Sequence, residues 1–197
     1  MSEIHEIFKV PVYGTKLTQD TKAISNYCLS LSKKSKGRFH SNSGGWQSDI
    51  LNKIDRPLKS LCDNIMSHSS IFLTNLGFKG KLLLNTLWIN INGYRDFNLV
   101  HKHDHCFISG VYYIKTPKDC GNIQFLHPGL DVFEVEWNNR GQDYNRFNST
   151  QWNFPAVSNS LYLFPSWLKH YVEPNLNKKE KRISISFNVN FSKVYRV

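Results

Sequence analysis

The chain has 197 residues, a length that suits one compact domain or one domain with an added helical layer. Hydrophobic residues make up 40% of it, which supplies enough apolar surface for a packed core and excludes disorder as the main state. The net charge of +10 favours anionic ligands or polyanions as partners. No apolar run reaches the roughly 20 residues that cross a bilayer, and the acidic start of the chain is unlike a secretory signal. We therefore expect a cytoplasmic protein without membrane contact.

The first 80 residues have the pattern of a strand followed by helices. Residues 4–14 alternate loosely between apolar and polar side chains and predict an edge strand. Residues 20–34 carry apolar side chains at helical spacing behind Asp20, a favourable N-cap, and predict a first helix. A polar, glycine-bearing loop then leads to residues 49–68, where an apolar stripe predicts a second helix that Pro57 kinks or divides.

From residue 81 onward, short segments rich in β-branched and aromatic residues alternate with Gly, Pro, Asn and Asp. Eight or nine short strands without intervening helices indicate a sandwich, barrel or jelly roll. We expect a mainly β fold, with a double-stranded β-helix (jelly roll) core over residues 81–197 and with residues 1–80 as a supporting layer of the same domain. The strands are predicted at residues 81–92, 98–104, 106–115, 121–127, 131–137, 151–156, 160–165, 170–174 and 182–191.

Three histidines, His101, His103 and His105, alternate at a spacing of two near the end of a predicted strand. Alternate side chains of a strand share one face, so two successive imidazoles can reach the same metal ion. His170, near the start of a later predicted strand, is a candidate for the third ligand. Neutral imidazoles suit Fe, Cu, Ni or Zn, and their spacing alone does not choose among these metals.

A second pair of polar residues follows twelve positions after His170. Arg182 and Ser184 lie two apart on the last predicted strand, where their side chains share a face. Together they can grip a carboxylate by charge-assisted hydrogen bonds. A metal ligand followed by such an anion clamp outlines a site for a carboxylate-bearing cosubstrate.

With these motifs the chain resembles the iron(II)- and 2-oxoglutarate (2OG)-dependent dioxygenases, and most closely their bacterial and cyanophage 2OG-Fe(II) oxygenase group. The resemblance implies a jelly-roll core, Fe(II) and 2OG as cofactors, and hydroxylation of an unidentified substrate by dioxygen with release of succinate and CO2. The stretches that carry it span most of the chain in the family's order: SNSGGWQS at 41–48, His101-x-His103 followed by SGVYY at 109–113, GNIQF at 121–125, FPSWLKH at 164–170 and RISISFN at 182–188.

Carried over by position, the resemblance implies His101, His103 and His170 as the metal ligands, with no separate catalytic residue. Most of the superfamily has a carboxylate where this chain has His103, so three imidazoles would leave the iron with a charge of +2 instead of about +1. A site with two histidines, or one in which His105 replaces His103, remains an alternative. Asp104 points to the opposite face of a regular strand and is expected outside the ligand set.

The resemblance also implies the residues that hold 2OG. Arg182 and Ser184 match the pair that binds the far carboxylate of 2OG. Tyr113 matches a position where related prolyl hydroxylases place a phenol on the same carboxylate. Asn90, on the preceding predicted strand, could reach the near carboxylate.

Two other readings compete with the oxygenase. A cupin-type thiol dioxygenase would also use three histidines for iron but no 2OG, and the Arg-x-Ser pair argues against it. A non-catalytic jelly-roll binding module, such as a phage structural or nucleic-acid-associated protein, is consistent with the positive charge. The abundance of Asn, Ser, Lys and Ile is typical of AT-rich genomes and indicates a phage or marine bacterial source. If the protein is encoded by a phage, the expected cytoplasmic location is the cytosol of the bacterial host. The sequence predicts neither the substrate nor the oligomeric state.

Overall fold

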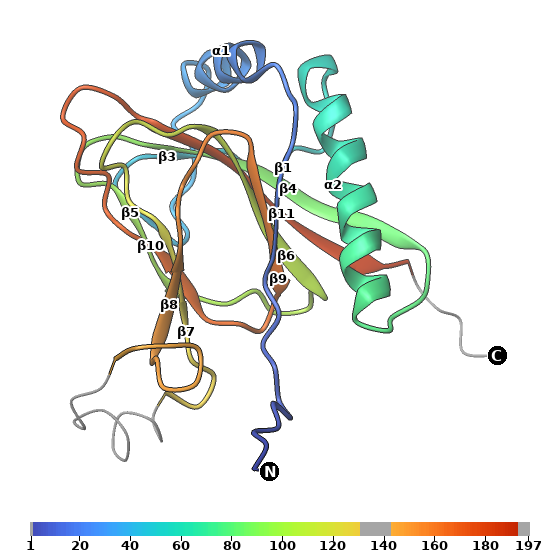
Figure 1. Ribbon diagram of the computed structural model, residues 1–197. Coiled ribbons are helices and arrows are strands. Elements are labelled where there is room, and N and C mark those ends of the chain that lie inside the picture. The colour runs from blue at the N-terminus through green and yellow to red at the C-terminus, as the bar shows by residue number, and fades with distance from the viewer. Residues whose placement is uncertain (1, 131–142, 193–197) are drawn as a thin grey trace.

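Two antiparallel sheets face one another in the structure, a computed structural model that describes residues 2–130 and 143–192 (Figure 1). Within these residues the larger sheet has six strands, in the order β1 (Tyr13–Lys16), β9 (Ser160–Pro165), β6 (Ile108–Lys115), β11 (Arg182–Phe191), β4 (Leu82–Asn92) and β3 (Trp46–Gln47). The smaller sheet has five, in the order β2 (Asn42–Ser43), β5 (Phe97–His101), β10 (His170–Val172), β7 (Ile123–Leu126) and β8 (Gln151–Phe154). This arrangement confirms the predicted jelly roll.

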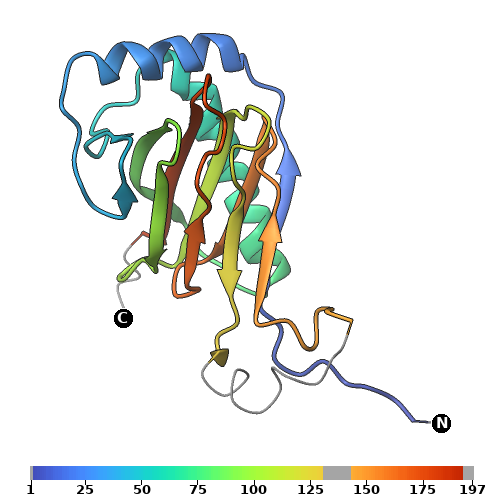
Figure 2. The ribbon, with the colours of Figure 1, turned by 90° about the vertical axis from the view of Figure 1, so that its left-hand side faces the viewer.

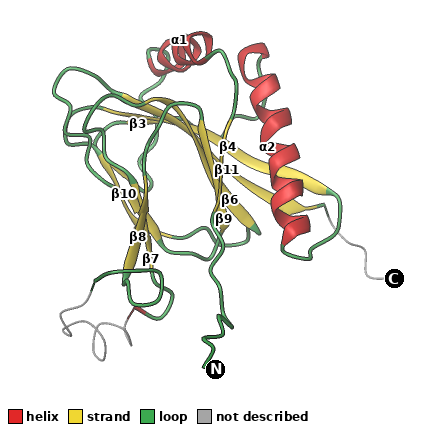
Figure 3. Cartoon of the chain, viewed as in Figure 1, coloured by secondary structure: helices red, strands yellow, loops and turns green. Residues whose placement is uncertain are grey.

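Two helices, α1 (Thr21–Ser32) and α2 (Arg56–Asn75), cover the outer face of the larger sheet (Figures 1 and 3). The Asp20 carboxylate caps α1 by accepting a hydrogen bond from the Ala23 amide at 3.0 Å, as its position before the helix predicts. The apolar stripe of α2 packs on aliphatic and aromatic side chains of β4, β9 and β11 in the main core. No helix in the described part of the chain combines the length and apolar composition needed to cross a membrane.

Two of the predicted elements near the N-terminus are displaced. The edge strand covers Tyr13–Lys16 instead of residues 4–14, because Tyr13 pairs with Leu163 and the partner strand ends two residues later at Pro165. The second helix begins at Arg56 and is not kinked, since Pro57 lies in its first turn. There the missing N–H of proline has no intrahelical partner to lose and its fixed φ suits the helix.

The strands after residue 81 follow the prediction more closely. The structure bears out the long strands at 82–92, 160–165 and 182–191 almost to the residue. The strand predicted at 98–104 already ends at His101, and the one predicted at 131–137 lies outside the described residues. The polar loop at 41–48 contains the two unpredicted short strands β2 and β3, which pair with β5 and β4.

The inner side of β11 is polar, and this positions the site. Along β11, Ile183, Ile185 and Phe187 belong to the core under the helices. The alternate residues Arg182, Ser184 and Ser186 line a cavity between the two sheets. Figure 2 shows the smaller sheet that closes this space from the other side.

Candidate metal centre

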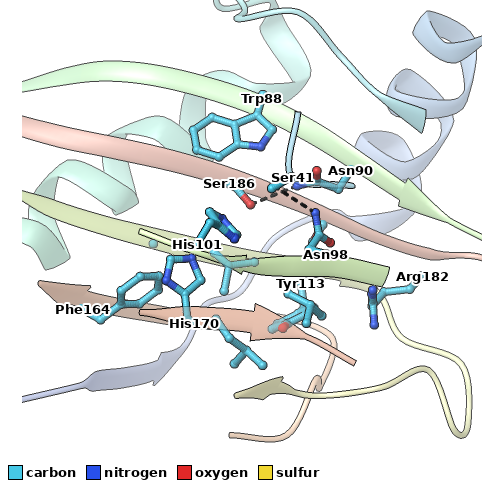
Figure 4. A pocket seen from close by; sticks show the side chains of 15 residues that line it. Ser41, Trp88, Asn90, Asn98, His101, Tyr113, Phe164, His170, Arg182 and Ser186 are labelled. Atoms are coloured by element: carbon cyan, nitrogen blue, oxygen red, sulfur yellow. Dashed lines mark hydrogen bonds between the residues drawn. The ribbon is translucent and has the colours of Figure 1, made fainter. Parts of the chain in front are cut away.

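Three imidazoles meet at one end of the space between the sheets. Antiparallel pairing of β5 with β10 places His101 directly opposite His170, with their ring centroids 4.4 Å apart (Figure 4). The ring of His103 lies 5.0 Å from that of His101 and 5.2 Å from that of His170. One ring nitrogen from each of the three lies within 4.8 Å of the others. This cluster has the donor set and the spacing to hold one transition-metal ion.

Backbone carbonyls fix the orientation of two of these rings. His101 Nδ1 donates to the Leu99 carbonyl at 2.7 Å, and His170 Nδ1 donates to the Leu168 carbonyl at 2.9 Å. A carbonyl oxygen can only accept, so the proton must be on Nδ1 in both rings. Each Nε2 therefore keeps its lone pair for a metal, which is the arrangement typical of histidine ligands.

Burial keeps the three rings neutral. It lowers the pKa of His101, and it lowers the pKa of His170 well below the usual value near 6.5. The pKa of His103 is lowered to about 4, mainly by burial and to a smaller extent by electrostatic repulsion from His101. Neutral imidazole is the form that binds a metal, so all three side chains are in the ligating state at neutral pH.

Residues 103–105 do not continue the strand that contains His101. Because β5 ends at His101, His103 lies in the turn between β5 and β6, not on the strand as predicted. His105 in the same turn has φ +61°, is exposed and is not part of the cluster. Asp104 is exposed and forms an ion pair with Lys102 at 3.0 Å, in agreement with its expected place outside the ligand set.

A buried arginine lies along the same cavity, beyond Tyr113 as seen from the histidines (Figure 4). Only 1% of Arg182 is exposed. Its Nη1 donates to the backbone carbonyls of Cys120, Gly121 and Glu173, and its buried Nη2 has no hydrogen-bond partner in the described part of the chain. None of the ion pairs formed within the described ranges includes Arg182. The guanidinium therefore has a free donor and a charge without a direct ion-pair partner to offer an anion.

The remaining residues predicted for the cosubstrate line the same cavity. Tyr113 is 1% exposed, and no described residue forms a hydrogen bond with its hydroxyl. Burial raises the pKa of Tyr113, so the phenol stays protonated and can donate. Ser184 faces the cavity from β11. Asn90 donates to the Ser186 hydroxyl at 3.0 Å, while its buried Oδ1 accepts no hydrogen bond from residues 2–130 or 143–192.

Sequence reasoning missed several residues of this site. Ser41, just before β2, and Asn98 of β5 line the cavity, where Asn98 Nδ2 donates to Ser41 Oγ at 3.4 Å. Ser41 begins the stretch at 41–48 that carries the resemblance and Asn98 begins a predicted strand, but neither belongs to a charged or metal-binding pattern that would mark it as a site residue. The Trp88 ring lies 5.6 Å from that of His103, at the metal end of the cavity.

A jelly roll with a three-nitrogen cluster and a buried arginine along the same cavity has the features of a metalloprotein that binds a small anion beside its metal. The sequence profile of the family described as "Putative 2OG-Fe(II) oxygenase" matches residues 86–188, which is more than half of the chain. The chain belongs to this family, and the protein is a 2OG-dependent Fe(II) oxygenase. A comparison with curated protein sequences returned no match.

Several solved structures have a similar fold. A prolyl-4-hydroxylase from Pseudomonas putida has a TM-score of 0.60 and 12% identity, covering 93% of this chain and 94% of that one. A prolyl hydroxylase from Trichoplax adhaerens, in complex with a hypoxia inducible factor peptide, has a TM-score of 0.57 and 15% identity, covering 90% and 82%. HygX from Streptomyces hygroscopicus, with nickel and 2OG bound, has a TM-score of 0.55 and 10% identity, covering 93% and 84%. These identities support the shared fold and not a shared substrate.

The residues of this chain fit Fe(II) and 2OG. Three neutral imidazoles provide nitrogen donors that suit ferrous iron. The unpartnered Nη2 of Arg182 and hydroxyl of Tyr113 are two donors for a carboxylate, in the same cavity as His101 and His170. A dicarboxylate with one end at the metal and the other at the arginine would satisfy both sets of groups.

Proposed function

We propose that this oxygenase hydroxylates its substrate with Fe(II) held by His101, His103 and His170. The observation that carries the proposal is that the three imidazoles form a cluster whose ring nitrogens lie within 4.8 Å of one another. Two of these rings share a cavity with a buried arginine that has a free donor. His101 and His170 offer Nε2 because their Nδ1 protons are already used.

We propose that Arg182, Tyr113 and Ser184 hold the far carboxylate of 2OG. The Arg182 Nη2 and the Tyr113 hydroxyl donate to it, and the three backbone carbonyls on Nη1 keep the guanidinium from rotating. Asn90 is the candidate for the near carboxylate, since it faces the same cavity and has spare hydrogen-bonding capacity.

When bound, Fe(II) and 2OG supply the oxidation, in which 2OG loses CO2 to give succinate and one oxygen atom of dioxygen reaches the substrate. The residues supply position and exclusion of water. Three neutral ligands leave the full +2 charge of the metal in place, whereas a carboxylate in the position of His103 would reduce it to about +1. We infer that this charge strengthens the binding of the dianionic cosubstrate.

Anaerobic reconstitution tests this function. Adding Fe(II) and 2OG to the metal-free protein should produce a weak visible absorption band that neither component gives alone, and admitting air should release succinate. A thiol dioxygenase would take up oxygen with a small thiol and yield no succinate. A non-catalytic module, including one that binds nucleic acid, would bind neither Fe(II) nor 2OG, and either result would reject the proposal.

Three further expectations belong to this proposal. We propose that residues 1–80 and 81–197 form one domain, because β1, β2 and β3 come from the first part and pair with strands of the second. We also propose a cytosolic location, in a bacterial host if the gene is from a phage, on the basis of the residue usage. The substrate is an organic molecule or a protein side chain with a C–H bond that can reach the metal end of the cavity.

A further inference from the structure

Three residues of the recognised motifs have no place among the metal ligands or the carboxylate clamp. They are Ser109 of SGVYY, Ser166 of FPSWLKH and Asn188 of RISISFN. All three are buried, with exposed fractions of 1%, 0% and 6%. They are far apart in the sequence, yet the structure joins them directly by hydrogen bonds.

These side chains form a directed hydrogen-bond chain across the larger sheet. Asn188 Nδ2 donates to Thr86 Oγ1 at 2.9 Å, so Asn188 Oδ1 is the acceptor for the Ser109 hydroxyl at 2.7 Å. A hydroxyl has one proton, and that of Ser109 is used in this bond. Ser166 must then donate to Ser109 Oγ at 2.8 Å. The strand register supports the chain, because Asn188 lies opposite Thr86 on one side and Ser109 on the other.

This series of hydrogen bonds ends at Ser166, whose backbone holds the turn that contains His103. The amide of His103 donates to the Ser166 carbonyl at 2.9 Å, and the Ser166 amide donates to the carbonyl of Phe107 at 3.2 Å. Both ends of the turn therefore attach to Ser166. Within the described ranges, no hydrogen bond reaches the ring of His103, in contrast to the rings of His101 and His170. The backbone of the turn must therefore fix the position of His103, because no hydrogen bond to its ring does so.

We propose that Ser109, Ser166 and Asn188 are positioning residues that hold His103 in place as the third metal ligand. The inference rests on the proposed function, since it takes His103 as a ligand. The Ser166 hydroxyl is fixed by Ser109, and this fixes the Ser166 carbonyl toward the His103 amide. His103 lies beyond the end of β5, so the ladder that orients His101 does not reach it. Through the side chains of Ser109, Ser166 and Asn188, the rigid larger sheet supports this ligand.

Titration of the metal-free protein with Mn(II), followed by the loss of the free Mn(II) resonance signal, tests the proposal without turnover. Ser109→Ala removes the central link and should weaken Mn(II) binding by roughly 10-fold, the lower end of the effect of groups that support metal ligands. Thr86→Val removes the last acceptor at a half-buried site and should weaken binding in the same direction but by less. It also serves as the second variant should Ser109→Ala fail to fold. The matched control is Ser69→Ala, a buried serine of α2 whose hydroxyl has no hydrogen-bond partner among the residues that the structure describes, and it should bind Mn(II) like the unaltered protein.

A double-mutant cycle with His103→Ala separates positioning from general structure. If Ser109 acts through His103, Ser109→Ala should change Mn(II) affinity less than about twofold once His103 is absent. A merely structural role would lower the thermal midpoint and reduce the affinity by the same factor in both backgrounds, and this result overturns the proposal. Unchanged affinity in Ser109→Ala and Thr86→Val also overturns it.

Two other outcomes concern the proposed function and not the positioning residues. If His103→Ala alone binds Mn(II) as tightly as the unaltered protein, the assignment of His103 as a ligand fails. Absence of Mn(II) binding by the unaltered protein would reject the metal site itself.

Discussion

The hydroxyl of Tyr113 is buried and has no partner among the described residues. Such a group costs roughly 1–3 kcal/mol of folding free energy, which the chain tolerates if a ligand satisfies it. Tyr113→Phe should therefore leave the metal-free protein as stable as before or up to about 1 kcal/mol more stable. The same change should weaken 2OG binding by about 10-fold, since a hydrogen bond to a charged group is lost. Denaturant unfolding in EDTA and calorimetric titration of the Mn(II) protein with 2OG measure the two effects.

Tyr27→Phe is the matched control for this substitution. The Tyr27 hydroxyl donates to Asp55 at 3.0 Å, between α1 and the residue before α2. Its loss should reduce stability and leave 2OG affinity unchanged, the reverse of the pattern at Tyr113. If Tyr113→Phe instead lowers stability and leaves 2OG binding intact, the phenol has a structural role and does not contact the cosubstrate.

Arg182 carries the only positive charge that we assign to the carboxylate clamp. Arg182→Ala should raise the 2OG concentration needed for half-saturation at least tens of times, because removing one partner of a buried charged pair costs about 2–5 kcal/mol. Mn(II) affinity without 2OG should stay nearly unchanged. Arg182→Lys keeps the charge but loses the forked geometry and should bind 2OG less tightly. Arg56→Ala, at an exposed position of α2, is the control, and equal 2OG saturation in all three variants would reject the clamp.

The three histidines also predict how the metal-free protein responds to pH. Their pKa values are lowered in the folded state, to about 4 for His103, whereas an imidazole of the unfolded chain titrates near 6.5. Between these values the unfolded chain binds protons that the folded protein does not, so this contribution to stability falls as the pH drops from 6.5 toward 4 and is complete above 6.5. Unfolding by denaturant at several pH values in EDTA measures the slope. His103→Leu should flatten it, and a stability independent of pH over this range would contradict the prediction.

At the scale of elements, the turn between β6 and β7 connects the smaller sheet to Arg182. Gly121 in this turn has φ +80°, and a Cβ atom there would lie 2.5 Å from the carbonyl oxygen of Glu173, one of the acceptors of Arg182. Gly121→Ala should displace this carbonyl and weaken 2OG binding several-fold. Gly77→Ala is the control, because Gly77 has φ +83° with no atom within 4 Å and so bears the backbone cost alone. Equal 2OG affinity in the two variants would show that the turn does not orient the guanidinium.

The elements differ in how far the sequence predicts them, for physical reasons. The strands β4, β9 and β11 are long runs of alternating or apolar residues, and their patterns predict their limits closely. The short strands β2 and β3 have two residues each and exist because β5 and β4 lie beside them, so their local sequence contains no strand pattern. The predicted start of α2 was too early, because Pro57 was taken for a kink inside the helix, whereas proline is favoured in the first turn of a helix.

The candidate site, like the helices and strands, was predicted only in part. His101 and His170 were predicted from their residue types and approximate strand positions, and the structure places them opposite one another. The place of His103 in a turn was not predicted, since β5 ends two residues before it, at His101, and strand ends are poorly marked in the sequence. The bonds from Ser109 to Ser166 and Asn188 join residues 57 and 79 positions apart, and no local pattern of a single sequence predicts such pairs.

At the scale of the whole molecule, the site joins the two sheets. His101 and His170 belong to the smaller sheet, whereas Tyr113, Ser184 and Arg182 belong to the larger one. A metal alone would bind chiefly on the side of the smaller sheet, and 2OG bound to that metal would reach the arginine of the larger sheet. We therefore expect Mn(II) and 2OG together to stabilise the protein more than the sum of their separate effects.

Ligand-linked stabilisation at a free concentration of 100 times the dissociation constant is about 2.7 kcal/mol, which corresponds to a rise in the thermal midpoint of about 5 to 10 °C for a chain of this size. Calorimetric scans with Mn(II), with 2OG in EDTA, and with both ligands measure the three effects. His170→Ala should abolish the joint effect, since it removes the one fully buried ligand of the three, and Arg182→Ala should reduce the joint effect to that of Mn(II) alone. If 2OG in EDTA stabilises the protein as much as 2OG with Mn(II), the cosubstrate does not bind to the metal and the two sheets are not joined through it.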